Sequence, residues 1–300
     1  MTEVILTDRL TKSYGARRGV IELSFSVSPG EVFGYLGPNG AGKTTTIRTL
    51  LDLIRPTSGR AFVFGLDSHR DAVRIHARIG YLPGEFSLYE HMTGAEYLTY
   101  LASLRGGVPM ERIRELAERL DVDLGAKIRT LSHGNRQKIG LIQAFMHRPE
   151  LLILDEPTQG LDPLIQHEFQ RLVEEVRIDG RTVFLSSHVM PEVERMCDRV
   201  GIIREGRLVA VEEIGELRAK ELRTLEIRFG HPVRADAFVG VPGVREVHVN
   251  GETARVTVNG PMDALVKRLA AFEVVDLTSH EPSLEEIFLT FYGRGKDDGD

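Results

Sequence analysis

The sequence predicts an α/β protein with a mostly parallel sheet, followed by a smaller α+β domain. Strand-like and helical patterns alternate up to about residue 217, as in a parallel sheet covered by helices. LLILD at 151–155 is a continuous apolar run, which is typical of a parallel strand buried on both faces. From residue 218 onward, short runs that alternate polar and apolar residues dominate. We therefore expect one domain at 1–217 and a second at 218–300.

The elements of the first domain follow from periodicity and from turn residues. Helices repeat apolar residues every three or four positions, whereas strands alternate them or run continuously, and Gly or Pro separates the two. The expected elements are strands within 1–35, a helix at 43–54, strands at 58–65 and 79–85, helices at 93–120 in two pieces and at 136–147, a strand at 151–155, a helix at 163–177, a strand at 182–187 and a helix at 191–197.

The second domain has the pattern of a split βαβ, ferredoxin-like module. Asn250-Gly251 is a strong two-residue hairpin signal between two alternating runs. Ser283 and Glu286 have the spacing of a capping box that opens a last helix. The expected elements are a strand at 222–230, a weak helix at 234–240, strands at 244–249 and 252–258, a helix at 262–272, a strand at 273–280 and a helix at 283–293.

Composition and charge narrow the class of protein. The 300 residues include 38 basic and 44 acidic side chains, which gives a formal charge of −6. This balance disfavours nucleic acid as the main partner, because phosphate backbones select basic surfaces. A single cysteine, Cys197, fits a reducing compartment. We find neither a signal peptide nor a run of ~18 apolar residues, so we expect a cytoplasmic chain; a membrane-spanning partner would be a separate polypeptide.

A phosphate-binding loop is the most specific motif. GPNGAGKT at 37–44 matches G-x-x-x-x-G-K-[ST] between a predicted strand and a predicted helix, the context that the motif requires. Glycines let successive backbone N–H groups point at phosphate, Lys43 reaches the β and γ phosphates, and the Thr44 hydroxyl binds Mg²⁺. The expected nucleotide-binding residues here are Gly37, Pro38, Asn39, Gly40, Ala41, Gly42, Lys43, Thr44 and Thr45.

Polar residues follow two predicted strands of the sheet. Asp155 and Glu156 end the 151–155 strand, and His188 follows the 182–187 strand. Because ligands of open α/β sheets bind beyond the carboxyl ends of the strands, these side chains should approach the phosphate loop. We expect Asp155 to hold Mg²⁺, Glu156 to orient or deprotonate the attacking water, and His188 to contact the γ-phosphate. No histidine or cysteine spacing supports a zinc site.

The order of the motifs resembles the ATP-binding cassette (ABC) family over about residues 3–215. After the phosphate loop come LSHGNRQK at 131–138, LLILDEPT at 151–158, GLDP at 160–163 and SSH at 186–188. LSHGNRQK resembles the family's signature motif, GLDP its D-loop and His188 its switch histidine. The resemblance implies that Tyr14, in TKSYG, stacks on adenine, and that Ser132 and Gly134 meet the γ-phosphate of another subunit's ATP.

The same resemblance implies an architecture and a set of partners. A RecA-like P-loop NTPase core carries an antiparallel β subdomain and a helical subdomain at about 84–146. Two cassettes, identical or related, face each other head to tail, and closure on ATP drives a separate membrane permease. The C-terminal piece resembles the accessory domain of bacterial drug, antibiotic and lipid exporters, and EPSLEEIFLTFYG is much like their ending. Alternatively, this domain is a stabilising or dimer-contacting appendage.

The sequence departs from the family pattern at three places, of which the third, Gln159 in place of a common serine before GLDP, is assigned no role. Gly84 occupies the usual position of the Q-loop glutamine; Glu85 is the candidate substitute as a Mg²⁺ ligand, or else the position only transmits motion. His133 and Asn135 replace the usual glycine and glutamine of the signature. The segment 85–98 follows the Q-loop and has exposed-looking Phe86, Leu88 and Tyr89. It either grips a permease helix or enters the helical subdomain facing the core.

Two other functions compete with an ABC exporter. A non-transport ATPase acting on ribosomes or chromosomes is disfavoured by the single cassette, by the lack of a long coiled coil and by the acidic charge. A kinase or GTPase is disfavoured because the Asn-Lys-x-Asp guanine motif is missing and the signature would be unexplained. Copurification with a hydrophobic partner would separate the exporter from both.

Overall fold

The computed structural model describes residues 3–15, 17–219 and 222–280 of the chain. Contacts divide it into two compact units, Met1–Glu212 and Glu213–Asp300, each with its own core. Among the described residues, none of the helices combines the length and the apolar character needed to cross a membrane.

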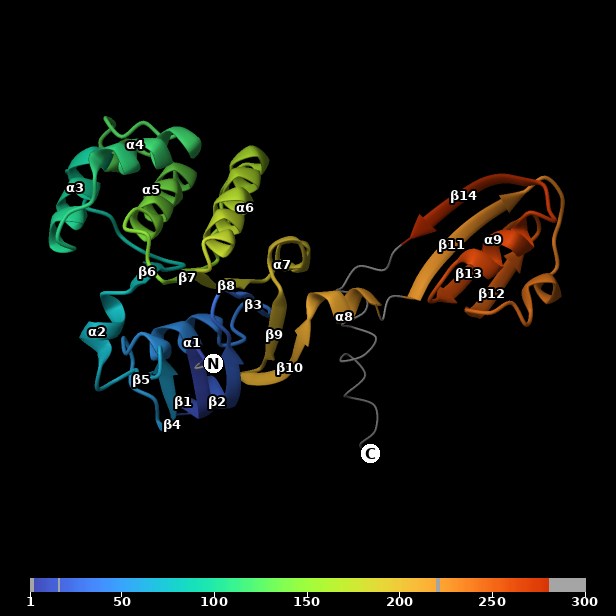
Figure 1. Ribbon diagram of the computed structural model, residues 1–300, viewed down its shortest axis with the longest axis horizontal. Helices are drawn as coiled ribbons and strands as arrows, with labels where there is room; N and C mark the ends of the chain where they lie inside the picture. The colour runs from blue at the N-terminus through green and yellow to red at the C-terminus, as the bar shows by residue number, and fades with distance from the viewer. Residues whose placement is uncertain (1–2, 16, 220–221, 281–300) are drawn as a thin grey trace. The chain divides into compact units, whose positions relative to one another are not determined.

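The first unit is built on a six-stranded sheet in the order β10-β9-β3-β8-β7-β6 (Figure 1). The pairs β3–β8, β3–β9, β7–β8 and β6–β7 are all parallel, as predicted. The sequence did not predict the two strands that follow residue 198. The strands are β3 (Val32–Leu36), β6 (Ile79–Leu82), β7 (Leu151–Asp155), β8 (Thr182–Ser187), β9 (Arg199–Arg204) and β10 (Arg207–Glu213).

A second, antiparallel sheet lies against the first and shares its core. Its order is β2-β1-β4-β5, with β1 (Ile5–Tyr14), β2 (Arg17–Val27), β4 (Ser58–Val63) and β5 (Leu66–Asp67). Phe25 of β2 stacks on Phe33 and Tyr35 of β3 and on Phe184 of β8, with ring centroids 5.6 to 6.1 Å apart. Burial of these large rings joins the two sheets into one core.

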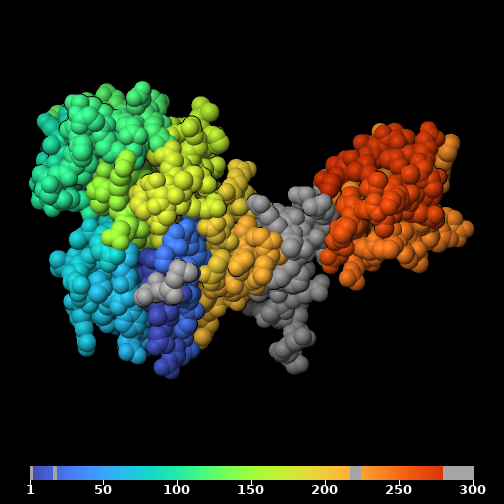
Figure 2. Space-filling model, viewed as in Figure 1, coloured from blue at the N-terminus to red at the C-terminus, as the bar shows by residue number. Residues whose placement is uncertain are grey.

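Helices cover the parallel sheet and form a separate lobe. The lobe contains α3, α4 and α5, and both α3 and α4 pack on α5. It is the green part of Figure 1 and Figure 2. The helices are α1 (Lys43–Leu50), α2 (Ala72–His76), α3 (Gly94–Leu104), α4 (Met110–Arg119), η1 (Ile128–Thr130), α5 (His133–Phe145), α6 (Pro163–Ile178) and α7 (Met190–Met196).

The segment 85–98 enters the helical lobe with mixed exposure. Leu88 is buried, so the prediction that it is exposed is wrong; the side chain contributes to the apolar interior. Phe86 is half-buried, and a Cβ at Gly140 of α5 would lie 2.6 Å from its ring. Tyr89 is exposed and packs its ring against Tyr97 at a centroid distance of 5.8 Å. Of the three candidate contacts, Tyr89 is therefore the most exposed, and Leu88 is not available on the surface.

The second unit contains a four-stranded antiparallel sheet, and α9 and η2 contribute side chains to its core. Its strand order is β12-β13-β11-β14, and Gly251, at φ 61°, turns the hairpin between β12 and β13. The predicted helix at 283–293 lies outside the described residues. The elements are α8 (Ile214–Ala219), β11 (Leu222–Phe229), η2 (Ala235–Phe238), β12 (Val244–Asn250), β13 (Thr253–Asn259), α9 (Asp263–Leu269) and β14 (Val274–His280).

Candidate functional site

The loop at 37–42 joins the end of β3 to the start of α1. Gly40 and Gly42 have φ angles of 79° and 112°, a backbone region that residues with a Cβ rarely adopt. A Cβ at Gly37 would lie 2.3 Å from the Ile203 carbonyl oxygen, so this position also needs glycine. The chain thus wraps tightly ahead of α1, where helix N–H groups lack partners and attract anions.

Lys43 is the first residue of α1 and is almost fully buried. Its Nζ donates hydrogen bonds to the carbonyl oxygens of Gly37 at 2.6 Å and Pro38 at 3.3 Å. It also lies 3.1 Å from Oε1 of Glu156 in an ion pair. Oxygen atoms therefore surround the ammonium group at the mouth of the loop.

Asp155 ends β7 and is fully buried. The Thr44 hydroxyl donates to its Oδ2 at 2.7 Å, and the Ser186 hydroxyl donates to its Oδ1 at 2.5 Å. A buried carboxylate is stable only when such partners compensate for its lost hydration. The arrangement sets a carboxylate and a hydroxyl oxygen side by side, which are ligands that Mg²⁺ prefers.

Glu156 follows Asp155 in a left-handed backbone conformation, at φ 51°. Its N–H donates to Oγ of Ser186 at 3.1 Å and to the carbonyl of the same residue at 3.3 Å. Its Oε2 lies 2.8 Å from Nδ1 of His188, and its Oε1 faces Lys43. The structure therefore brings together five predicted site residues: Lys43, Thr44, Asp155, Glu156 and His188.

The other predicted site residues lie apart from this group. Among the described residues, neither Tyr14, Glu85 nor Ser132 has a hydrogen bond or ion pair to the group. Tyr14 ends β1 with its ring exposed, and Lys12 Nζ is 5.3 Å from the ring centroid. Ser132 caps α5, its Oγ accepting from the Asn135 N–H at 3.2 Å. Gly134, in the first turn of that helix, lies against the Gly160 carbonyl, where a Cβ would come within 2.6 Å.

Gly84 lies directly beside the buried carboxylate. A Cβ at this position would be 3.2 Å from Oδ2 of Asp155. The side chain of Glu85, the next residue, is exposed. The position that lacks a side chain is therefore the one that faces Asp155.

Comparison with known proteins identifies the family. The model of the "ABC transporter" family matches residues 20–159. The bacitracin transport ATP-binding protein of Bacillus licheniformis is 35% identical over 98% of this chain and 99% of its own. The chain belongs to the ABC transporter family. The Nod factor export ATP-binding protein I of Rhizobium etli is 34% identical over 98% of this chain and 94% of its own.

Solved structures of the family agree with this result. The structure described as an "ATP binding subunit of ABC transporter" is 29% identical, with a TM-score of 0.65 over 72% of this chain and 92% of that one. A dimeric cassette in a post-hydrolysis state with ADP and phosphate shares the fold at a TM-score of 0.64 and 20% identity. The chain is an ATP-binding, ATP-hydrolysing ABC subunit, and the RecA-like P-loop core is confirmed.

Sequence reasoning missed three polar residues of this ABC site. Ser186 bonds Asp155 and Glu156, and Glu192 accepts from the Thr158 and Ser187 hydroxyls at 2.8 and 2.9 Å. Gln137 of α5 donates to the carbonyl oxygens of Glu156 at 3.3 Å and Pro157 at 3.2 Å. Ser186 lies in β8, two residues before the predicted His188, and pairs with Asp155 of β7, so the parallel pairing alone could have indicated it.

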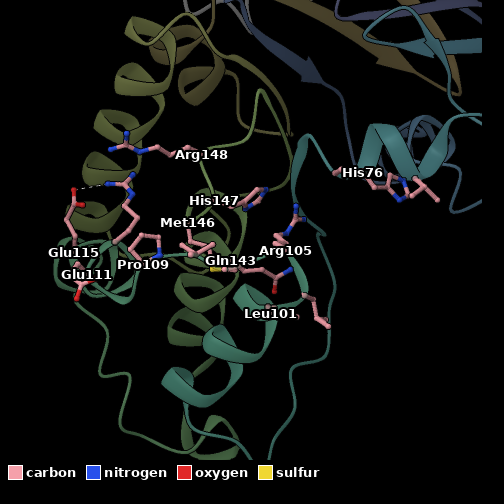
Figure 3. A pocket seen from close by; sticks show the side chains of 16 residues that line it. His76, Leu101, Arg105, Pro109, Glu111, Glu115, Gln143, Met146, His147 and Arg148 are labelled. Atoms are coloured by element: carbon pink, nitrogen blue, oxygen red, sulfur yellow. Dashed lines mark hydrogen bonds and ion pairs between the residues drawn. The ribbon is translucent and has the colours of Figure 1, made fainter.

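A large groove of the ABC subunit lies between α2 and the helical lobe (Figure 3). Its volume is about 1300 Å³. Arg105 and His147 both donate to the Ile79 carbonyl, at 3.2 and 3.1 Å. Burial, helped by the charge of Arg105, lowers the pKa of His147 to about 4, so this imidazole is neutral. Residues that line the groove include His76, Leu101, Arg105, Pro109, Met146 and His147.

Proposed function

We propose that the chain is the ATP-hydrolysing subunit of an ABC exporter and works as a pair of cassettes on the cytoplasmic face of a membrane, bound to a separate permease. The observation that carries this proposal is the convergence of Lys43, Asp155, Glu156 and His188 beside the glycine loop at one edge of the parallel sheet. Ligands of such sheets bind at this edge.

The phosphates of ATP would bind at the loop and Lys43. Backbone N–H groups at the start of α1 provide donors and a favourable partial charge. The ammonium of Lys43 is already surrounded by three oxygen atoms, from Gly37, Pro38 and Glu156. Phosphate oxygens can replace these partners without moving Lys43 to a new place.

The residues present fit Mg²⁺. The Thr44 hydroxyl and the Asp155 carboxylate lie 2.7 Å apart at the loop, and both are oxygen ligands. When bound, the ion would neutralise charge on the β and γ phosphates. Glu85 remains a further candidate ligand, since its exposed side chain follows Gly84, which faces Asp155.

Glu156 is the proposed general base. Its carboxylate would accept a proton from the water that attacks the γ-phosphate, and the bond from that water oxygen to phosphorus forms as the bond to the β-phosphate oxygen breaks. His188 Nδ1 lies 2.8 Å from its Oε2, which sets the direction of the carboxylate once the phosphates have replaced Glu156 at Lys43. A base in this role contributes about 10²–10⁴ in rate.

The partner cassette would complete each site. Ser132 and Gly134 open α5, so free N–H groups there can bind the γ-phosphate of ATP held by the other subunit. Tyr14 has an exposed ring that can stack on adenine. The groove of Figure 3 and the exposed ring of Tyr89 are the proposed contacts for the permease.

The relatives favour a function in export. One is named for bacitracin transport and another for Nod factor export, and both match this chain over nearly its full length. We extend the direction of transport, but no particular cargo, to this chain.

The substitution Glu156→Gln tests the function. We expect ATP binding to persist and hydrolysis to fall at least about 100-fold, because the amide cannot accept the proton. An ATP-bound dimer should then accumulate and elute early by size exclusion. Glu150→Gln is the control, since Glu150 precedes β7 and its carboxylate pairs with Arg78 on the surface. Normal hydrolysis by Glu156→Gln would refute the assignment of the base.

A further inference from the structure

Gln137 connects α5, the helix that begins in the LSHGNRQK motif, to the backbone of Glu156 within one subunit. It lies in α5 and is 3% exposed. Its Nε2 donates to the Glu156 carbonyl at 3.3 Å and to the Pro157 carbonyl at 3.2 Å. We infer that Gln137 is a positioning residue for ATP hydrolysis, which holds Glu156 in its working orientation. This inference rests on the proposed role of Glu156.

The backbone of Glu156 needs such support. Its φ of 51° is uncommon for a residue with a side chain, and conformations of this kind persist where the surroundings over-determine them. Ser186 accepts hydrogen bonds from the Glu156 N–H through its hydroxyl and its carbonyl oxygen. On the other side of the same residue, Gln137 and the Gln159 N–H, at 3.2 Å, both donate to the carbonyl, and Gln137 is the side chain that does so from α5. Ser186 and Gln137 thus bond the two peptide groups from which the carboxylate extends.

The rest of the α5 N-terminus packs on the same stretch of chain. A Cβ at Gly134 would lie 2.6 Å from the Gly160 carbonyl, and a Cβ at Gly160 would lie 2.7 Å from the ring of His133. Residues 133, 134 and 137 occupy neighbouring positions on one face of a helix, since a turn takes 3.6 residues. The first turns of α5 therefore rest on residues 156–160. A movement of Ser132 with α5 reaches Glu156 directly through Gln137.

A small displacement of Glu156 has a large effect on rate. Misplacement of a reacting group by about 1 Å costs on the order of 10²-fold. Removal of the Gln137 amide takes this donor from the buried Pro157 carbonyl and leaves the Glu156 carbonyl with the Gln159 N–H, at 3.2 Å, which loosens the left-handed residue. Nucleotide binding depends on the 37–45 loop, which Gln137 does not contact.

The test is Gln137→Met, which keeps the length of the side chain and removes its N–H donors. We expect kcat for ATP to fall about 10- to 100-fold, with the Kd of the separated monomer for ATP changed less than about twofold. Gln166→Met is the matched control, because Gln166 of α6 also donates to a backbone carbonyl, that of Leu161 at 3.1 Å. The control should keep kcat within about twofold.

A double variant separates positioning from a general structural role. In the Glu156→Gln background, Gln137→Met should leave the residual single-turnover rate unchanged, since the group that Gln137 positions is gone. The double variant should still form the ATP-dependent dimer. If Gln137→Met does not fold, as judged by circular dichroism, Gln137→Asn is measured with the same expectations, because its shorter amide cannot reach both carbonyls.

The outcomes are distinct. The inference is overturned if Gln137→Met has the kcat of the wild type, or if its ATP affinity falls in step with kcat. It is also overturned if the double variant no longer forms the dimer, or if Gln137→Met lowers the rate as much in the Glu156→Gln background as in the wild type. If Glu156→Gln itself hydrolyses ATP normally, the proposed base fails instead. An inactive Glu156→Gln beside a fully active Gln137→Met would refute only the role of Gln137.

Discussion

Substitution of Ser186 by alanine removes one hydroxyl that serves two residues of the site. The hydroxyl donates to Oδ1 of Asp155 at 2.5 Å and accepts from the Glu156 N–H at 3.1 Å. Asp155 is fully buried, and Oδ1 has no other donor among the described residues, whereas Thr44 continues to bond Oδ2. The variant therefore leaves half of a buried carboxylate without a partner.

The size of the effect follows from this geometry. A hydrogen bond to a charged group contributes about 1.5–3 kcal/mol, and the buried carboxylate gains no water in exchange. We expect the free energy of unfolding of the first unit to fall by about 2 kcal/mol, which lowers its Tm by about 4–8 °C for a unit of this size. If the same energy is lost in the transition state of hydrolysis, kcat falls about 10- to 150-fold.

Ser187→Ala is the matched control. Its hydroxyl also bonds a carboxylate, that of Glu192 at 2.9 Å, and the residue is equally buried, but it does not contact Asp155. Thermal melts without nucleotide should therefore show a similar loss of stability for both variants. Only Ser186→Ala should lower kcat and raise the Mg²⁺ concentration needed for half-maximal hydrolysis. Equal hydrolysis and equal Mg²⁺ dependence in the two variants would refute the reasoning.

Two further predictions concern the helical lobe. Ser132→Arg should abolish turnover while the separated monomer still binds ATP, because the N-terminus of α5 meets the ATP of the other subunit only in the dimer. Equilibrium binding of a fluorescent nucleotide to the monomer checks this. Loss of that binding would contradict a role across the interface. His147 should make the first unit less stable as the pH falls from about 6.5 towards its folded pKa of about 4, because the unfolded imidazole takes up a proton in this window and the buried one does not. The free energy of unfolding should change by at most about 1.4 kcal/mol per pH unit in this window, and partial solvent screening reduces this slope. Urea titrations at pH 7 and pH 5 should show a smaller difference in the free energy of unfolding for His147→Gln than for the wild type. An unchanged difference would show that His147 is not the source of the pH dependence.

Local patterns accounted for much of the site. The loop at 37–42 needs only glycines and an adjacent helix start, and these lie within eight residues of sequence. The phosphate loop could therefore be predicted from the sequence. LLILD is continuous and apolar because β7 has parallel neighbours and is buried along its length. The register of the sheet then placed Asp155 opposite Ser186, and His188, two residues further on, lies against Glu156.

Other features depended on contacts between residues far apart in the chain. Leu88 looked exposed in a polar stretch, yet it is buried in the helical lobe. Strands β9 and β10 were not predicted, although β9 pairs with β3 for most of its length. Sequence patterns do not reveal which neighbour will cover a short segment, because burial is a property of the packed elements.

The sequence by itself determined the family, the phosphate loop, the acidic strand end and the histidine that follows β8, since each lies in a short motif with its own local geometry. Only the tertiary structure decided that Ser186 holds Asp155, that Gly84 faces the same carboxylate, and that Gln137 reaches Glu156 from 19 residues away. Such partners are set by the packing of α5 and β8 against β7. A buried hydrogen-bonding group must find its partner wherever the fold places one.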